Sequence, residues 1–339
     1  MLEALLILFL SFVPMFIYAS IFWWFDRYEK EPLGLLIAAF VWGAIPSIIL
    51  ALIMQLALDI PLTALSPNQL TYDLLGASVS APLTEEGIKA LALIILLLFL
   101  RREIDSPMDG LIYGGLVGFG FAAVENFFYL LGAYMEGGVG GVLILTFLRA
   151  GLFGLNHAMF TAFTGLGVAL SLEVRKKLLK PALVFGGFTL AVIAHSLHNA
   201  FAVFAGYTNG WPILLAILAD WSGVLVILAV AIGSYILERK RIVAYAQALV
   251  KVQAVPAEEI DVLKSTFRRR IARLRMLLTG KFNLWWKTTR YQHKVSEAAF
   301  TWHRMNHGDE KAQKHLIRLE KEFLALRQSL APNGDVVVK

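Results

Sequence analysis

The sequence predicts an all-α fold: a polytopic transmembrane helical bundle of about seven spans, followed by a C-terminal helical tail on the cytosolic side. Three observations support this prediction. Hydrophobic residues make up 58% of the 339-residue chain and its mean hydropathy is +0.66, which is far too apolar for a soluble domain of this length. Apolar runs of about 20 residues, each able to cross a bilayer core as a helix, recur before the tail. Among the connections between these runs, only every second one contains Lys or Arg.

The apolar runs define the expected spans in order. The predicted spans are residues 2–25, 33–57, 77–100, 109–134, 143–170, 182–206 and 211–237. The first run lacks a basic start and a cleavage site, so we interpret it as a retained span. The connection 58–76 contains Pro61, Pro67 and Asn68 and is expected to be an irregular outside loop. Residues 1–237 therefore form one membrane-embedded domain.

Positive charge in the connections predicts the orientation of the chain. Lys and Arg occur in residues 26–32, 101–108 and 171–181 and directly after 237, but not in 58–76, 135–142 or 207–210. Basic connections are retained on the cytoplasmic side of a membrane. The alternation therefore predicts a multi-pass plasma-membrane protein with its N-terminus outside and its C-terminus in the cytoplasm.

Residues 238–339 form a basic tail with helical periodicity. Residues 1–237 hold 10 basic and 15 acidic residues, a net charge of −5, whereas the tail holds 21 and 10, a net charge of +11. Between Phe267 and Leu278, five arginines alternate with apolar residues, which gives a helix an apolar stripe beside a basic face. Such a helix suits anionic lipid headgroups; packing of the stripe inside a small helical domain is the alternative. Nucleic acid is not an expected partner, because no recognised binding motif is present.

Ionisable side chains inside the expected spans indicate a functional site. Placing one in a bilayer costs roughly 2.5–3.5 kcal/mol, so such groups mostly face a protein interior or a cavity. The polar candidates on spans three to six are Glu85, Glu86, Lys89, Glu125, His157, His195, His198 and Asn199. Counted along each span, they lie at one level in the outer half of the bilayer. Arg149 and Asp220 are interpreted as packing or anchoring charges.

Helical spacing relates several of these side chains to one another. Lys89 follows Glu85 by four residues and Glu86 by three, so one lysine can neutralise one glutamate and leave the other available. His198 is displaced from His195 by about 60° around a helix, so both histidines can face one pocket.

Two hydrolytic chemistries fit this set of residues. The candidate zinc ligands are Glu125, His157, His195 and His198. The candidate catalytic residues are Glu85, Glu86, Lys89 and Asn199. In the first chemistry, Glu125, His157 and His195 bind zinc, and Glu85 or Glu86 takes the proton of the attacking water. In the second, a glutamate activates water without a metal, and His and Asn side chains stabilise the oxyanion.

Several motifs, taken in order, resemble those of the PrsW family. They are D-x-Y-x-x-E-P at Asp26–Pro32, E-E-x-x-K at Glu85–Lys89, F-x-x-x-E-N at Phe121–Asn126, then His157 and the run His195–Asn199. The resemblance covers about residues 20–205, and the ordered set is specific although each motif alone is weak. The tail lies outside the resemblance.

The resemblance implies a membrane-embedded peptidase, described as a metalloprotease and related to the CAAX-prenyl-processing membrane proteases. Bacterial members of the family are linked to cleavage of membrane-anchored anti-sigma factors on the extracytoplasmic side. By motif, Glu85 and Glu86 correspond to the catalytic carboxylates. The ligands or polar partners would be Glu125, His157 and His195. The prenyl-processing relatives end the second motif in His, where this chain has Glu125.

Two other functions are compatible with intramembrane glutamates and histidines. A transporter could use them as a proton relay, and a catalytically silent scaffold could use them to bind helices. The chain has no evident internal repeat and its polar groups are confined to one level, and both features argue against a carrier. The leading prediction is a peptidase that acts on a membrane-anchored protein substrate.

Overall fold

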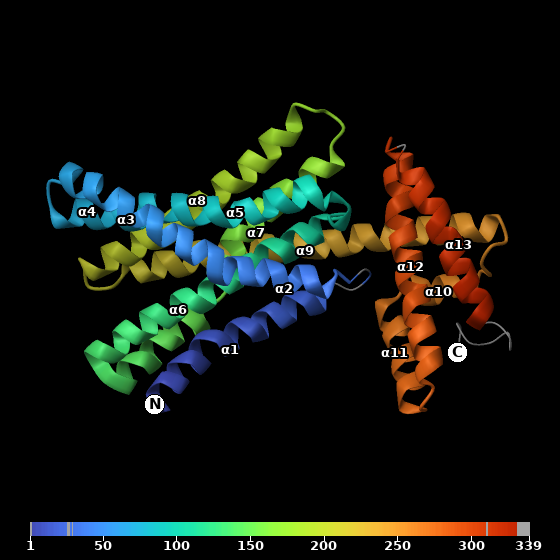
Figure 1. Cartoon of the computed structure of the whole chain (residues 1–339), viewed down its shortest axis with the longest axis horizontal. Coiled ribbons are helices and arrows are strands. Elements are labelled where there is room, and N and C mark those ends of the chain that lie inside the picture. Colours follow the sequence, from blue (N-terminus) through green and yellow to red (C-terminus); the bar gives the residue numbers. More distant parts are fainter. Residues whose placement is uncertain (1, 26–27, 29, 310, 331–339) are drawn as a thin grey trace. The chain divides into compact units, whose positions relative to one another are not determined.

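The computed structural model describes residues 2–25, 28, 30–309 and 311–330 and shows helices without a strand in this part of the chain. The predicted polytopic helical bundle is therefore confirmed. The chain divides into two compact units: a membrane unit of Met1–Phe25 and Glu31–Ile232, and a tail unit of Asp26–Lys30 and Gly233–Lys339 (Figure 1). Three residues of the first predicted motif, Asp26, Arg27 and Glu29, lie outside the described residues.

The membrane unit is built from long apolar helices interrupted by short π-helical turns. Its elements are α1 Leu2–Phe25, α2 Leu33–Trp42, η1 Gly43–Ser47, α3 Ile48–Leu65, α4 Gln69–Leu75, η2 Gly76–Ser80, α5 Ala81–Phe99, η3 Arg101–Glu103, α6 Pro107–Thr146, η4 Phe147–Leu152, α7 Asn156–Glu173, α8 Leu179–Gly206 and α9 Pro212–Lys251, which continues into the tail unit. The prediction of an irregular loop at 58–76 is wrong. Helix α3 accommodates Pro61, and the Asn68 side chain caps α4 by accepting from the Thr71 amide at 2.9 Å.

Five helical stretches of the described chain are long and apolar enough to cross a membrane. They are Leu2–Trp24, Leu33–Leu65, Pro107–Glu173, Leu179–Gly206 and Pro212–Lys251. Helix α5 is not among them, and it carries three charged side chains at Glu85, Glu86 and Lys89. The 67-residue stretch Pro107–Glu173 reverses direction at Gly138, whose φ of +58° is strained for any residue with a Cβ. The total of seven spans remains a prediction.

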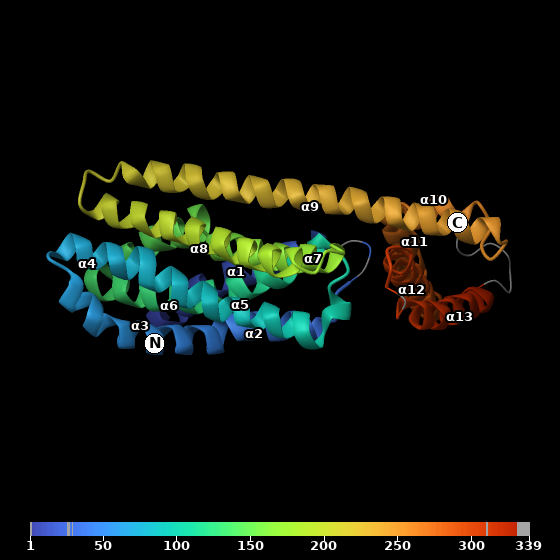
Figure 2. The same ribbon diagram turned by 90° about the horizontal axis from the view of Figure 1, so that it is seen from above.

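The turns that lack Lys and Arg gather at one end of the membrane unit. The N-terminus, the α3–α4 turn, the reversal within α6 and the α8–α9 turn lie at the left in Figure 1, and Figure 2 shows the turns of α3–α4 and α8–α9 at the same end. The basic connections α5–α6 and α7–α8 lie at the opposite end. This arrangement agrees with the alternation of charge in the sequence. Which end faces the outside remains a prediction.

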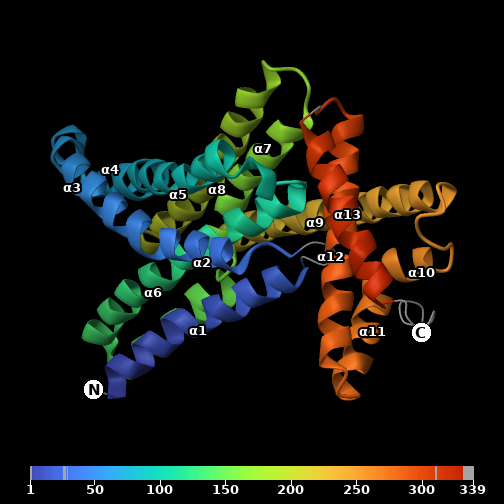
Figure 3. The ribbon, with the colours of Figure 1, turned by 45° about the vertical axis from the view of Figure 1, so that its right-hand side comes forward.

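The tail unit consists of the C-terminal part of α9 and four further helices, and it has a hydrophobic core of its own. These helices are α10 Glu259–Leu263, α11 Thr266–Leu278, α12 Phe282–Asn306 and α13 Ala312–Leu330, and α12 lies beside α13 and α11 (Figure 3). The core residues include Tyr245, Tyr291, Val295, Leu319 and Phe323.

The predicted stripe on α11 lies largely outside the tail core. Phe267, Leu274 and Leu278 are 71%, 54% and 78% exposed. The tail is therefore a small helical domain with its own core, but the apolar stripe of α11 does not pack inside it. Contact of this stripe with lipid remains a prediction.

Candidate functional site

Helix α5 carries the charged centre of the site on little more than one helical turn. Glu85, Glu86 and Lys89 are all buried, although each is ionisable. Lys89 Nζ lies 2.8 Å from Glu86 Oε1 and 3.6 Å from Glu85 Oε2, the pairing that the spacing predicts. Glu86 is fully engaged, because its other oxygen accepts from Thr161 at 3.0 Å. Glu85 Oε2 has no hydrogen-bond partner. The single lysine is therefore bound chiefly to Glu86 and leaves one oxygen of Glu85 available.

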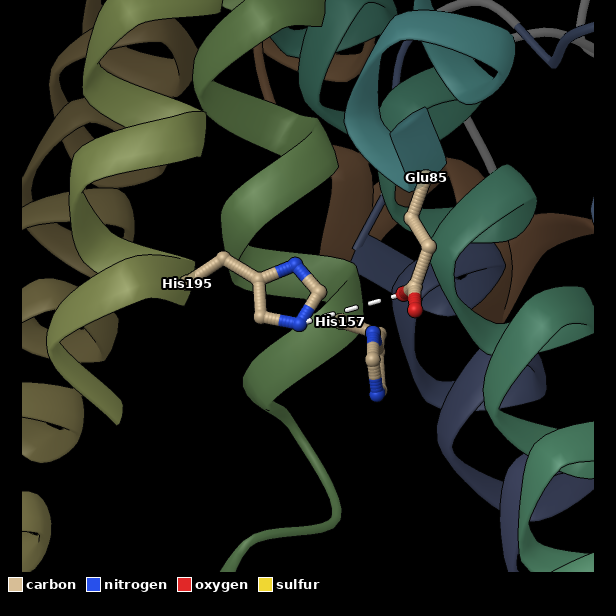
Figure 4. A group of neighbouring side chains, drawn as sticks. All are labelled: Glu85, His157 and His195. Atoms are coloured by element: carbon tan, nitrogen blue, oxygen red, sulfur yellow. Dashed lines mark ion pairs between the residues drawn. The ribbon is translucent and has the colours of Figure 1, made fainter. Parts of the chain in front are cut away.

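Two histidines from other helices converge on that available oxygen. His157 lies in the first turn of α7, and His195 lies in the middle of α8. One ligand atom from each of Glu85, His157 and His195 lies within 4.8 Å of the others, as Figure 4 shows. His195 Nε2 is 3.8 Å from Glu85 Oε2, and the two imidazole rings meet edge to face with centroids 5.1 Å apart. The three side chains form a compact donor set of two imidazoles and one carboxylate.

Each histidine of this donor set contacts a carboxylate through one of its two ring nitrogens. His195 Nδ1 lies 3.1 Å from Glu86 Oε1, and His157 Nε2 lies 2.7 Å from Glu125 Oε2. Histidines that bind metals usually donate their second N–H to a carboxylate in this way, which fixes the ring and the tautomer. The other ring nitrogen of His157, Nδ1, lies 3.1 Å from Lys89 Nζ. The Lys89 ammonium therefore lies directly beside the donor set.

Glu125 and His198, the other predicted ligands, lie outside the group of three. Glu125 pairs with Arg149 as well as with His157, and Arg149 Nε donates to Asn126 Oδ1 at 2.7 Å. His198 Nδ1 lies 2.7 Å from Asp220 Oδ2, and that oxygen also accepts from Asn156 at 2.9 Å. Their roles as ligands remain predictions.

Asn199 holds the backbone that leads into α5. Its amide donates to the carbonyl oxygen of Ala77 at 2.7 Å, within the π-helical turn η2. A π-helical turn widens the backbone hydrogen-bond ladder, and such turns are frequent at functional sites. This turn lies about one helical turn before Glu85. The bond to Asn199 therefore links α8 to the segment that positions Glu85.

A cavity of about 600 Å³ opens onto one side of the donor set. Its polar lining consists of Gln55, Glu85, Glu125, Asn126, Tyr129, Arg149, Asn156, His157, His198 and Asn199. Apolar side chains such as Phe121, Leu145 and Phe153 supply most of the remaining wall. A peptide segment entering this space would meet Glu85, Glu125 and His157, together with polar donors such as Asn156 and Asn199.

The protein family of this chain follows from its similarity to known proteins. The family model described as "PrsW family intramembrane metalloprotease" matches residues 31–236, which is more than half of the chain. The chain belongs to the PrsW family. PrsW proteins are intramembrane proteases, so this chain is an enzyme that hydrolyses peptide bonds, and the resemblance seen in its motifs is confirmed.

Similar proteins carry the same family name. Protease PrsW of Geobacillus kaustophilus is 27% identical over 202 residues, which cover 60% of this chain and 81% of the relative. Protease PrsW of Clostridioides difficile is 37% identical over 105 residues, 31% of this chain and 42% of the relative. Protease PrsW of Shouchella clausii is 25% identical over 204 residues, 58% and 85% of the two chains. No solved structure matches this PrsW chain.

Sequence reasoning missed or undervalued four side chains around the PrsW site. Gln55 Nε2 donates to Glu85 Oε1 at 3.2 Å, and Thr161 bonds Glu86. Both are polar residues in apolar spans, a signal weaker than a charge but visible in the sequence. Arg149 and Asp220 were interpreted as packing charges, yet they hold Glu125 and His198 at the cavity. Their charge was the signal, and only the fold shows which partners they have.

Proposed function

We propose that this protein is a zinc-dependent intramembrane peptidase in which Glu85, His157 and His195 hold the metal. The observation that carries this proposal is the donor set itself, whose ligand atoms lie within 4.8 Å of one another and whose two histidines are each backed by a carboxylate. Two histidines and one glutamate form a common catalytic zinc set that leaves a position open. The oxygen of Glu85 that has no hydrogen-bond partner supports the same fit.

The side chains of the chain supply what such a site needs beyond the metal. Zinc in this position would act as a Lewis acid toward water and the peptide carbonyl. Among described residues, Glu125 is the other carboxylate that lines the cavity, so it is placed to accept the proton of the attacking water. His198, held by Asp220, and Asn199 line the same cavity and can donate hydrogen bonds to the carbonyl oxygen. Glu86 and Lys89 orient His195 and balance the charge.

The proposed substrate is a membrane-anchored protein cut near the extracytoplasmic side, such as a regulator resembling an anti-sigma factor. The cavity is lined by both polar and apolar residues, which suits a polypeptide that leaves the bilayer. The placement of the basic connections at the opposite end from the N-terminus supports an outside N-terminus and a cytoplasmic tail.

Metal analysis of the purified full-length protein tests the proposed zinc site. We expect about one zinc per chain, and we expect His157→Ala to lose it because one of three ligands is gone. The matched control is His315→Ala, a tail histidine that pairs with Glu297. Chelation should stop proteolysis and added zinc should restore it. Full proteolysis by a metal-free protein would exclude zinc and leave Glu85 as the direct activator of water.

The contact of the tail with anionic lipid is likewise a proposal. The exposed apolar stripe of α11 lies beside Arg268, Arg270 and Arg275, a pattern that binds anionic bilayer surfaces. In the reconstituted full-length protein, we expect amide hydrogen exchange of residues 266–278 to be slower in bilayers with anionic lipid than in neutral ones. Equal exchange in the two bilayers would contradict the contact.

A further inference from the structure

A second cavity of about 530 Å³ adjoins the cavity of the candidate site. The two cavities share wall residues: Gln55, Ala77, Ala81, Ala202 and Val203. Gln55 also bonds Glu85, so the shared wall reaches the donor set directly. The second cavity extends from that wall toward α4 and the C-terminal end of α8, at the end of the membrane unit that holds the turns without Lys or Arg. We call it the acidic pocket.

The polar lining of the acidic pocket includes two carboxylates and two phenols, in addition to Gln55 and Ser80. Tyr72 donates its hydroxyl hydrogen to Asp59 Oδ1, and Tyr207 donates to Asp73 Oδ2 at 2.6 Å. Asp73 Oδ1 accepts from Gln69 at 2.7 Å. These bonds hold both carboxylates in place without neutralising them. In the part of the chain that the structure describes, neither aspartate forms an ion pair with Lys or Arg, and no Lys or Arg lines the pocket.

A buried hydroxyl adds a second, independent sign of a ligand. Ser80 lines the pocket and is 8% exposed, yet its Oγ has no hydrogen-bond partner. A serine in a regular helix usually satisfies its hydroxyl on the carbonyl four residues earlier, as Thr84 does here at 2.8 Å to Ser80 O. Ser80 ends the π-helical turn η2 and leaves its hydroxyl unpaired. An unpaired buried polar atom is unfavourable, and a bound donor that reaches it would relieve this cost.

We propose that the acidic pocket binds a lysine or arginine side chain of the substrate and thereby sets which peptide bond lies over Glu85. Two carboxylates held by hydrogen bonds attract a cation, and Tyr72 and Tyr207 in the same lining offer aromatic rings near it. The long aliphatic stem of Lys or Arg matches the alanine, valine and glycine part of the wall. The shared wall places this side chain a short stretch of polypeptide from the scissile bond. This inference rests on the proposed peptidase function and adds a rule for substrate choice.

Cleavage of matched substrates by the full-length enzyme in bilayers tests the inference. A single Arg is moved through the positions flanking the scissile bond of a membrane-anchored substrate, with Gln at the same positions as reference. We expect one or two Arg positions to raise kcat/KM by about 10- to 100-fold, mainly through KM. Asp59→Asn with Asp73→Asn should abolish the preference of Arg over Gln. Asp73→Lys should shift the preference to Glu at the same position.

Controls separate this inference from the function on which it rests. Glu136→Gln removes an exposed acid outside the lining of both cavities, and it should keep the preference for Arg. If Glu85→Gln stops cleavage of every substrate while the wild type shows no preference between Arg and Gln, the peptidase stands and the acidic pocket is wrong. The same conclusion follows if the double Asn variant keeps the preference. If Glu85→Gln cleaves like the wild type, the proposed function fails and this inference fails with it.

Discussion

Replacing Glu85 with glutamine is expected to lower kcat/KM for a cognate substrate by about 10³-fold or more, while the protein stays folded. Glutamine has the same shape and keeps its contact with Gln55, but it is a poor zinc ligand and cannot take a proton. Stability should change less than in a variant of Glu86, because Lys89 keeps its closer partner, Glu86 at 2.8 Å, and loses only the longer pair with Glu85 at 3.6 Å. Substrate processing, zinc content and the thermal unfolding midpoint of the same preparation check this expectation.

The adjacent substitution, Glu86→Gln, is expected to behave differently. Glu86 is fully buried and accepts from Lys89 at 2.8 Å and from Thr161 at 3.0 Å, with His195 at 3.1 Å. Loss of its charge leaves the Lys89 ammonium with Glu85 at 3.6 Å as its remaining acid among described residues. Removing one partner of a buried ion pair typically costs about 3–5 kcal/mol. We expect Glu86→Gln to lower the unfolding temperature as well as activity, and to weaken zinc binding by about 10- to 100-fold through His195.

The pair of variants also separates the competing functions. A carrier that relays protons, or a scaffold without activity, would leave substrate processing unchanged in both variants. Glu136→Gln serves as the control for loss of a carboxylate at an exposed position. If Glu85→Gln processed its substrate like the wild type and Glu86→Gln failed only through instability, the peptidase mechanism assigned to Glu85 would be wrong.

The sequence predicted contacts best where both partners lie on one helix. The spacing of Glu85, Glu86 and Lys89 fixed their pairing, because residues three and four apart are neighbours on a helix whatever surrounds it. The common depth of the polar groups also predicted that His157 and His195 would lie near them, and the structure brings all three helices together. Fold class followed from apolar length alone, since helices satisfy their own backbone groups in a bilayer.

Contacts between helices depend on rotation and bends that sequence periodicity does not encode. The fifth predicted span, 143–170, was expected to be one helix, but it consists of the end of α6, the π-helical turn η4, a break and then α7. The break places His157 in the first turn of α7 rather than in a helix interior. It also leaves Arg149 on η4, from where it reaches Glu125. Spacing along the sequence could rank Glu125 as a candidate ligand, but the pairing with Arg149 required the bend.

The second large effect is expected from Gly118 on α6, a residue without a side chain. A Cβ built at this position would lie 2.2 Å from the carbonyl oxygen of His157 and 2.6 Å from Ala158 Cα. Both atoms belong to the backbone of α7, so neither can move without moving the helix. Gly118→Ala should therefore push α7, and His157 with it, away from Glu85. We expect a loss of about 1–3 kcal/mol in the free energy of unfolding and of about 10²-fold in proteolysis for a displacement of about 1 Å.

Gly132→Ala provides the matched control on the same helix, because nothing lies within 4 Å of a Cβ at that position. Alanine is favoured over glycine in a helix by about 0.5–1 kcal/mol, so helix propensity alone predicts that both variants are at least as stable as the wild type. Close packing instead predicts opposite changes in stability. Gly132→Ala should be neutral or stabilising, whereas Gly118→Ala should be destabilising and should lose zinc. Unfolding midpoints and zinc content of the two variants decide between these predictions. Equal stability and equal zinc would mean that the approach of α6 to α7 does not position His157, and the donor set would then have to be held by α5 and α8 alone.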